Sequence, residues 1–436
     1  MKSHFTLIKN AQLVEYCKKR ITDCDILIKN ASGGYESVVV EVGQHINTGA
    51  LSEMTFSVFD ARGNYVLPSF TDLFCCFREP DAMYKENIEK TLAAAQAGGY
   101  SRLLAFHEND KRQEDKLYGV SYIRTHTASC ACKVMLAAPA LPDDMDRAVI
   151  NGAVAFTDAF IQFPDVVSQR SAMKECADRG LLYVAFAADR SLVGDGAVNS
   201  GDVAGMLSVK GIGSACEEIA VMRALLLAEE TGCRTHISGI STGRSVDFIR
   251  QAKKSGISVS CDVSPNHIFF DEYALMYYGG TAKLLPPLRS YRDKEAIVEG
   301  ICDGTIDCVA SHHIPNESDS RIQRKMAPTP LSAVPFGAVG LQIVFPACVE
   351  ALLVPGYIDI FRLVELLCVN PAKVLSSKPQ EAFRDIESGS QADMNVVSVR
   401  EKVTVNESFV KGKAINTPFF GMTLCGRVIK NFTDGR

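Results

Sequence analysis

The stretch Leu182-Tyr183-Val184-Ala185-Phe186-Ala187 contains only apolar residues in a row. Such a run is typical of a strand that is covered on both faces, as parallel strands flanked by helices are. Similar short apolar runs alternate along the chain with longer amphipathic stretches, which is the pattern of strand–helix units. Eight strands are predicted, and they begin near Leu67, Tyr100, Cys130, Ala153, Leu182, Arg234, Ser258 and Asp307.

Helices are predicted between these strands. The clearest begins at Ser214, because Ser214 and Glu217 have the spacing of a capping box and Gly232 follows the apolar run as a stop signal. Two more are predicted over about 245–256 and 290–304. Eight strand–helix units predict an α/β fold, a (β/α)8 TIM-type barrel, with functional groups at the C-terminal ends of the strands.

The two ends of the chain do not follow the strand–helix pattern. They carry short strand-like runs separated by turns, so we expect residues 1–66 and 388–436 to pair into one small composite β domain beside a barrel of residues 67–387. The runs are Asp25–Ile28, Val38–Val40, Asn395–Val397 and Val403–Val405.

The composition excludes several classes of partner. The chain of 436 residues has a formal net charge of -5, so it has no basic excess to attract nucleic acid or an anionic lipid surface. Residues 1–10 lack an apolar signal region, and no stretch approaches the roughly 18 apolar residues of a membrane span. We expect a cytoplasmic protein without a nucleic-acid or membrane partner. The scattered cysteines favour buried apolar roles over a disulfide framework or a structural zinc site.

A second stretch carries the chemistry. Pro68-Ser69-Phe70-Thr71-Asp72-Leu73-Phe74-Cys75-Cys76-Phe77-Arg78-Glu79-Pro80 resembles the first barrel strand of the dihydroorotase family, which reads Pro-Gly-Phe-Ile-Asp-x-His-x-His-Leu-Arg-Glu-Pro. Other segments resemble family landmarks in the same order. They are Thr235–Thr242, Asp262–His267, Lys283–Arg289, Gly304–Pro315, Pro335–Leu341, Asn370–Ala372 and Asn406–Phe409. The resemblance implies an amidohydrolase barrel of the cyclic amidohydrolase superfamily.

The resemblance also implies a reaction. Members of the family open or close the ring of dihydroorotate at an amide bond. The amide is a poor electrophile, and the water that attacks it is a poor nucleophile. A bound zinc ion lowers the pKa of its water to about 7 and polarises the carbonyl. An aspartate at the end of the last strand then moves the proton.

Almost every position of that zinc site is changed here. The resemblance places four metal-binding histidines at Phe74, Cys76, Phe186 and Gly239, and it keeps one acidic ligand as Asp158. One carboxylate does not hold a catalytic zinc ion. We therefore expect no cofactor.

The substrate positions are changed as well. The resemblance puts His312 at the catalytic aspartate and retains Arg78, which would bind the substrate carboxylate. Two amide positions of the family hold Glu108 and Leu285, and this change should weaken the binding of dihydroorotate. The alternative for Arg78 is a structural ion pair with a nearby acid.

A remodelled zinc site is the main alternative to a lost one. Cys76 and His312 end the first and last strands, which are neighbours in a closed barrel, and with Asp158 they offer thiolate, imidazole and carboxylate ligands. Against this hypothesis, Phe74 and Phe186 should place apolar rings in the former metal cavity.

Three other histidines are expected to be structural. Strand alternation should point His236 to the face opposite the position of Gly239. His267 and His313 are expected as ordinary histidines of the barrel rim.

Two functions remain open. The first is a non-catalytic dihydroorotase-like protein, a pseudoenzyme with a scaffold or regulatory role linked to pyrimidine biosynthesis. For it the resemblance suggests aspartate transcarbamoylase or an active dihydroorotase homologue as partner, and a homo-oligomer. The second is an active dihydroorotase or related cyclic-amide hydrolase with a remodelled site, which converts dihydroorotate and water to N-carbamoyl-aspartate. The chain has no dinucleotide fingerprint, P-loop or nucleophile elbow.

Overall fold

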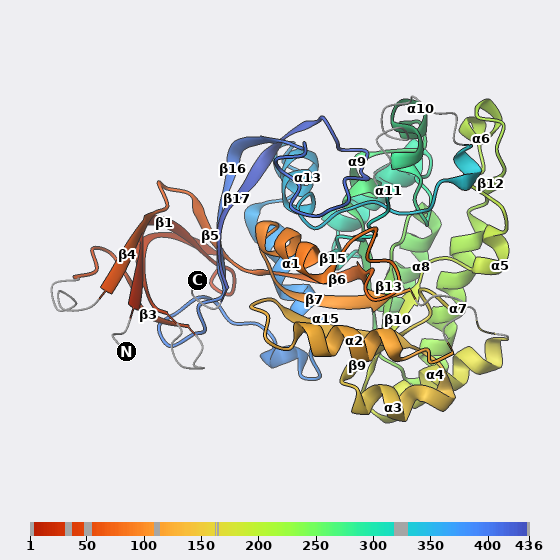
Figure 1. The fold of residues 1–436 in the computed structure, drawn as a ribbon, viewed down its shortest axis with the longest axis horizontal. Helices are drawn as coiled ribbons and strands as arrows, with labels where there is room; N and C mark the ends of the chain where they lie inside the picture. The colour runs from red at the N-terminus through yellow and green to blue at the C-terminus, as the bar shows by residue number, and fades with distance from the viewer. Residues whose placement is uncertain are drawn as a thin grey trace.

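The computed structural model describes residues 4–30, 37–47, 55–108, 114–161, 163, 165–317 and 330–433. Figure 1 shows a helix-covered barrel on one side and a separate curved β sheet on the other, at opposite ends of the long axis. Both ends of the chain lie with the separate sheet.

The barrel strands follow one another around a sheet in chain order, each parallel to the next. They are β6 (Phe70–Phe77), β7 (Tyr100–His107), β8 (Lys133–Pro139), β9 (Ala153–Thr157), β10 (Leu182–Phe186), β13 (Thr235–Ser238), β14 (Val259–Val263) and β15 (Cys308–Val309). The ring closes just after β15, where His313 forms a parallel bridge with Cys75 and its carbonyl oxygen accepts a hydrogen bond of 2.8 Å from the N–H of Cys76. The predicted (β/α)8 barrel is confirmed.

Helices cover the outside of this ring (Figure 1). The longer ones are α1 (Ile88–Ala97), α2 (Tyr118–Thr127), α4 (Val166–Asp178), α7 (Ala215–Thr231), α8 (Gly243–Lys254) and α11 (Tyr291–Cys302). Shorter ones are α3 (Met145–Ile150), α5 (Arg190–Val193), α6 (Asp202–Met206), α9 (Pro265–Phe269), α10 (Ala274–Tyr278), α13 (Val344–Cys348), α14 (Ile360–Val364) and α15 (Asn370–Leu375). A two-stranded ladder of β11 (Val198–Asn199) and β12 (Gly211–Ile212) lies beside α6.

Local capping explains where several helices begin and end. The side chain of Thr242 accepts from the N–H of Ser245 at the start of α8, and Ser290 accepts from the N–H of Asp293 at the start of α11. Gly232 ends α7 in the left-handed conformation, as predicted.

The predicted capping box at α7 is wrong. Ser214 has helical dihedral angles and makes no side-chain cap. Glu217 instead points inward, fully buried, and accepts hydrogen bonds from the N–H groups and hydroxyls of Ser241 and Thr242. The carboxylate of Glu217 is therefore bound by residues distant in the sequence and not by the N-terminus of its own helix.

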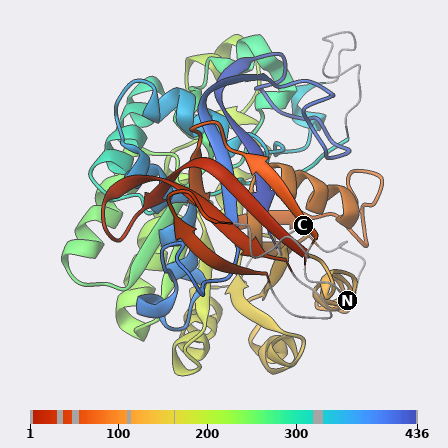
Figure 2. The same ribbon diagram turned by 90° about the vertical axis from the view of Figure 1, so that its left-hand side faces the viewer.

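The separate sheet joins both ends of the chain (Figure 2). Its strands are β1 (His4–Glu15), β2 (Arg20–Lys29), β3 (Val38–Gly43), β4 (Thr55–Asp60), β5 (Tyr65–Pro68), β16 (Met394–Thr404) and β17 (Thr423–Phe432). The order is β17-β16-β5-β1-β2-β3, with β4 paired to β1. The domain boundaries at 66/67 and 387/388 stay a prediction. Among the residues that the structure describes, no helix is long and apolar enough to cross a membrane.

Candidate functional site

Aromatic rings occupy the centre of the barrel at the C-terminal ends of its strands. Phe74 of β6 is fully buried. Its ring stacks on Phe106 of β7, with centroids 4.3 Å apart, and on the imidazole of His312 at 4.7 Å. Phe186 of β10 lies 5.9 Å from the same ring. Stacked aromatic rings exclude water and contribute dispersion and burial energy, so this place is an apolar core.

Beside the rings, a single buried carboxylate gathers four donors. Asp262 of β14 accepts from Nε2 of His236 at 2.9 Å, from the hydroxyl of Ser238 at 2.9 Å, from the N–H of Gly239 at 2.8 Å and from Nε2 of His312 at 2.7 Å. Burial alone would raise the pKa of Asp262, but the imidazoles of His312 and His236 hold it well below its usual range. The carboxylate is therefore ionised and fully satisfied.

His236 does not point away from this cluster, so the prediction from strand alternation is wrong. Its Nδ1 contacts the hydroxyl of Ser260 at 2.8 Å, inside the barrel. Alternation fails because β13 ends at Ser238, and Gly239 follows with a φ of +81°. The positive φ turns the backbone out of the strand geometry.

His312 and Gly239 compete for one volume. A Cβ atom on Gly239 would lie 2.8 Å from Cε1 of His312. His312 itself has a φ of 44°, which is uncommon for a residue with a side chain. The imidazole from the end of the eighth strand thus takes the space into which a side chain at position 239 would project.

Cys76 and Asp158 are held in separate surroundings. Cys76 is fully buried, and burial raises the pKa of its thiol, so the neutral form is favoured. Asp158 accepts from the N–H of Phe186 at 2.7 Å, from the hydroxyl of Tyr183 at 3.0 Å and from Gln169 at 3.2 Å. Burial raises its pKa as well.

The donor set does not fit a catalytic zinc ion. At the four expected histidine positions stand two buried phenyl rings, a buried neutral thiol and a glycine, at Phe74, Phe186, Cys76 and Gly239. Across the described ranges, no three His, Cys, Asp or Glu side chains lie together as metal ligands. Asp262 holds His312 and β10 holds Asp158, so the structure does not bring Cys76, Asp158 and His312 together. A remodelled zinc site of these three residues stays a prediction.

Arg78 lies at the end of β6 with every guanidinium nitrogen engaged. Nε donates to the carbonyl of Pro315 at 2.7 Å, Nη2 to Asn316 at 3.1 Å and Nη1 to the carboxylate of Glu108 at 2.8 Å. The side chain of Glu108 is 52% exposed, whereas that of Arg78 is 4% exposed. An ion pair with an acid is thus present, and the substrate-binding role of Arg78 stays a prediction.

His267 and His313 are buried rather than exposed at the rim. His267 contacts the hydroxyl of Ser264 at 2.8 Å and the carbonyl of Pro286 at 3.1 Å. His313 accepts from the N–H of Gly340 at 3.2 Å. Burial lowers the pKa of both imidazoles to about 3, so both are neutral structural groups.

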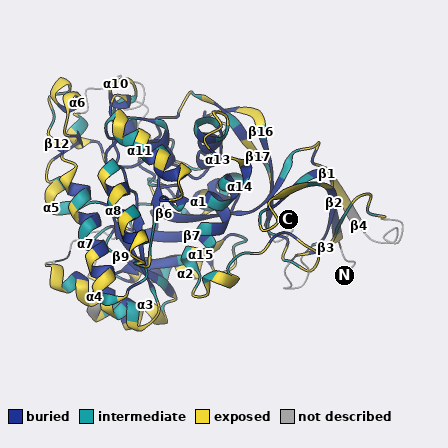
Figure 3. Ribbon diagram, turned by 180° about the vertical axis from the view of Figure 1, so that it is seen from behind, coloured by how far each residue is buried: buried dark blue, intermediate teal, exposed yellow. Residues whose placement is uncertain are grey.

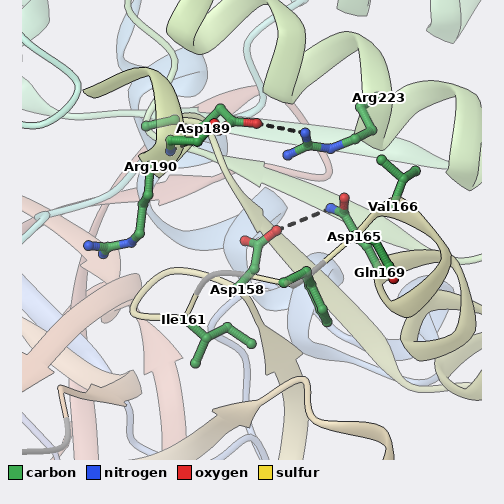
Figure 4. A pocket seen from close by; sticks show the side chains of 11 residues that line it. Asp158, Ile161, Asp165, Val166, Gln169, Asp189, Arg190 and Arg223 are labelled. Atoms are coloured by element: carbon green, nitrogen blue, oxygen red, sulfur yellow. Dashed lines mark hydrogen bonds and ion pairs between the residues drawn. The ribbon is translucent and has the colours of Figure 1, made fainter. Parts of the chain in front are cut away.

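A pocket of about 290 Å³ lies next to the barrel mouth, between the N-terminus of α4 and the segment after β10. Figure 4 shows Asp158 pointing to Gln169, and Arg223 paired with Asp189. The Arg223–Asp189 distance is 2.7 Å. Several polar groups of this pocket pair with one another, but Nε of Arg190 and Nε of Arg223 are buried and have no hydrogen-bond partner within the described part of the chain.

Comparisons with known proteins agree with the architecture. The family model "Dihydro-orotase-like" matches residues 63–245. A protein of Caldanaerobacter subterraneus named dihydroorotase is 32% identical over 427 residues, covering 94% of this chain and 96% of that protein. A dihydroorotase of Staphylococcus epidermidis is 31% identical over 429 residues, with 96% of each chain covered.

Solved structures show the same fold at lower identity. An L-hydantoinase from Arthrobacter aurescens superposes with a TM-score of 0.82 at 22% identity, covering 100% of this chain and 96% of its own. A D-hydantoinase gives a TM-score of 0.81 at 17% identity, covering 99% and 94%. These structures support a TIM-type barrel with an additional β domain.

Proposed function

This chain belongs to the dihydroorotase family, and we propose that it is a dihydroorotase-like protein that does not itself perform zinc-assisted ring hydrolysis. Its role is to bind and regulate, or to scaffold, a partner in pyrimidine biosynthesis.

One observation carries the proposal. The ring of Phe74 lies stacked between Phe106 and His312, at 4.3 and 4.7 Å, where the resemblance expects the first zinc-binding histidine. Water-assisted hydrolysis of an amide needs a polarised carbonyl and an activated water. A stacked phenyl ring supplies neither of them.

Metal content and turnover test the proposal together. The protein is purified without chelator, supplied with zinc and analysed by elemental mass spectrometry, and dihydroorotate hydrolysis is measured on the same sample. The relative from Caldanaerobacter subterraneus is the positive control. We expect zinc far below one ion per chain and no hydrolysis above background. Stoichiometric zinc with turnover would overturn the proposal.

The second candidate function is an active cyclic-amide hydrolase with a remodelled site. It is favoured by the near full-length relatives that are named dihydroorotase. Within this chain, the buried Asp262–His312 pair at 2.7 Å is the group best suited to move a proton. On this hypothesis His312→Ala abolishes turnover, whereas Cys176→Ala, at a buried core position of α4, leaves it unchanged.

The partner is tested separately from catalysis. We propose aspartate transcarbamoylase or an active dihydroorotase homologue as the bound protein. Purified candidates from the same organism are mixed with the chain and analysed by sedimentation velocity. A complex whose transcarbamoylase or dihydroorotase rate differs from that of the free enzyme supports the regulatory role, and a complex with an unchanged rate supports scaffolding alone. Absence of any complex with either enzyme contradicts the assignment of the partner.

A further inference from the structure

A polar pocket lies at the N-terminal face of the barrel, opposite to the strand ends that carry the candidate site. Its volume is about 460 Å³, within the range of small-molecule sites. The starts of β7 and β8, the end of α2 and the segments that precede β16 and follow β17 line it. The barrel and the separate sheet therefore both contribute to it, and junctions of this kind are a common place for ligands.

Positive charge is in excess in this pocket. Among the described residues that line it, the charged side chains are Arg102, Arg124, Lys133 and Asp393. Asp393 pairs with Arg102 at 3.2 Å. In the part of the chain that the structure describes, neither Arg124 nor Lys133 has an acidic partner. The whole chain has a net charge of -5, so two uncompensated cations in one concave site indicate an anionic ligand.

Two of these cations lie side by side in the sheet. Arg102 of β7 and Lys133 of β8 are register partners in the parallel pairing of the two strands, so their side chains leave the sheet on the same face. The rest of β7 is buried, and Figure 3 shows this strand in dark blue. Like charges at neighbouring positions repel each other, and Asp393 compensates only that of Arg102. An anion bound beside them removes the repulsion.

Arg124 is positioned to add a third cation without losing all its donors. Its Nη1 donates to the carbonyl oxygen of Ile150 at 2.9 Å. This bond orients the guanidinium, which has five N–H donors in a planar fork. Such a fork binds phosphate oxygens in pairs, and a lysine ammonium binds phosphate as a point charge.

Asp393 lacks one donor. Its Oδ2 accepts from the hydroxyl of Ser101 at 2.9 Å and pairs with Arg102. Its Oδ1 is buried and has no hydrogen-bond partner among the described residues, although the side chain is only 15% exposed. Leaving a buried acceptor without a donor is unfavourable. A hydroxyl group of a ligand would supply the missing hydrogen bond.

The lining also narrows the class of anion. Among the described residues no aromatic side chain lines the pocket, so it offers no ring on which a nucleobase could stack. Arg102, Gln391 and Asp393 also border an adjoining pocket of about 400 Å³, which leaves room for more than a free phosphate ion. A phosphate monoester carries nearly two negative charges at neutral pH, which matches the two unpaired cations.

We propose that this pocket binds a phosphate monoester of a small polyhydroxylated metabolite, of the class of a pentose phosphate. The phosphate lies between Arg124 and Lys133, and a hydroxyl group donates to Oδ1 of Asp393. The bound ester joins the barrel to the segment before β16 and therefore stabilises the junction. This site is independent of zinc, of ring hydrolysis and of a partner protein.

Calorimetric titration of the full-length chain tests the site with three probes: ribose 5-phosphate, inorganic phosphate and ribose, in a phosphate-free buffer of low salt. We expect a dissociation constant below about 1 mM for the ester, binding at least about tenfold weaker for inorganic phosphate, and none for ribose. Lys133→Gln and Arg124→Gln should each raise the dissociation constant of the ester on the order of tenfold. The ester should also raise the melting temperature of the wild type.

The matched control removes the same charge elsewhere. Lys254 is the exposed last residue of α8, and Lys254→Gln should leave the dissociation constant unchanged. Thermal melting without ligand verifies that every variant is folded. The proposal is overturned if the ester gives neither heat nor a rise in melting temperature, or if Lys133→Gln and Arg124→Gln both bind it like the wild type. Equal affinity for inorganic phosphate and the ester overturns the role of Asp393.

Discussion

Gly239 and His312 lie so close that only a residue without Cβ fits at position 239, since a Cβ there would lie 2.8 Å from Cε1 of the imidazole. The resemblance expects a histidine at 239 and an aspartate at 312. An imidazole thus lies at the position where the resemblance expects an aspartate, and Asp262 of β14 anchors it at 2.7 Å. Replacing only one of the two residues by the one that the resemblance expects should therefore destabilise the protein.

The first prediction concerns Gly239→Ala. It should lower the free energy of unfolding by about 1–2 kcal/mol for the positive φ, and by a further amount for the contact with His312. Gly256→Ala is the matched control, because Gly256 has the same φ of +81° and nothing within 4 Å of its Cβ position. Urea denaturation measures the free energy of unfolding of both variants. Equal losses would mean that His312 moves aside at no energetic cost.

The restoring change gives a second prediction. Gly239→His should destabilise the protein more than Gly239→Ala, because a second imidazole enters an occupied volume. His312→Asp added to it should recover part of the loss, so the two changes are not additive. The wild type, the two single variants and the double variant are compared by urea denaturation. If the two changes in the free energy of unfolding were additive in the double variant, positions 239 and 312 would not share one volume.

A third prediction follows from Asp262. Replacing it by Asn should cost about 3–5 kcal/mol at neutral pH, because a buried charge that bonds two imidazoles is removed. Since the folded pKa is depressed, the stability of the wild type is present above the unfolded pKa of about 3.9 and is lost as the pH falls further. The difference between wild type and Asp262→Asn should therefore shrink as the pH falls below about 4. Asp143→Asn, on the exposed surface, should show neither effect.

The sequence predicted the barrel but not its central contacts, for a physical reason. Apolar runs such as Leu182–Ala187 report burial on both faces locally, and β10 lies where that run predicts it. The cluster around Asp262 depends on β13 and β14 in register and on the closure of the ring near His313. The sequence did contain one signal for this cluster. Polar residues alternate in both strands, as His236 with Ser238 and as Ser260 with Asp262, which indicates a polar face inside the barrel. Glu217 was mispredicted for the same reason. Its carboxylate accepts a hydrogen bond from Ser241, which is distant in the sequence, and so does not cap its own helix.

A fourth prediction concerns the fully buried Asp72, which accepts from the N–H and hydroxyl of Ser311, both at 2.6 Å. Burial raises its pKa to about 7. Since the folded pKa lies above the unfolded one, this group makes the protein less stable as the pH rises from about 4 to 7. The loss can reach roughly 4 kcal/mol, because one pKa unit corresponds to about 1.4 kcal/mol. Relative to Asp72→Asn, the wild type should lose stability across that interval in urea titrations. A pH-independent difference would contradict the raised pKa.

The last prediction separates two roles of Arg78. A lysine cannot reach the oxygens of Pro315, Asn316 and Glu108 together, so Arg78→Lys should lower the free energy of unfolding by about 1–3 kcal/mol without any ligand. Glu108→Gln should cost less than about 1 kcal/mol, since Glu108 is half exposed.

Ligand binding then distinguishes these variants further. The carboxylate of Glu108 already takes Nη1 of Arg78, so a ligand carboxylate has to displace it. Calorimetric titration with dihydroorotate should therefore show tighter binding to Glu108→Gln than to the wild type, and none to Arg78→Lys. If Glu108→Gln left a measurable wild-type affinity unchanged, Glu108 would not compete for the guanidinium, and the ligand would bind elsewhere in the barrel.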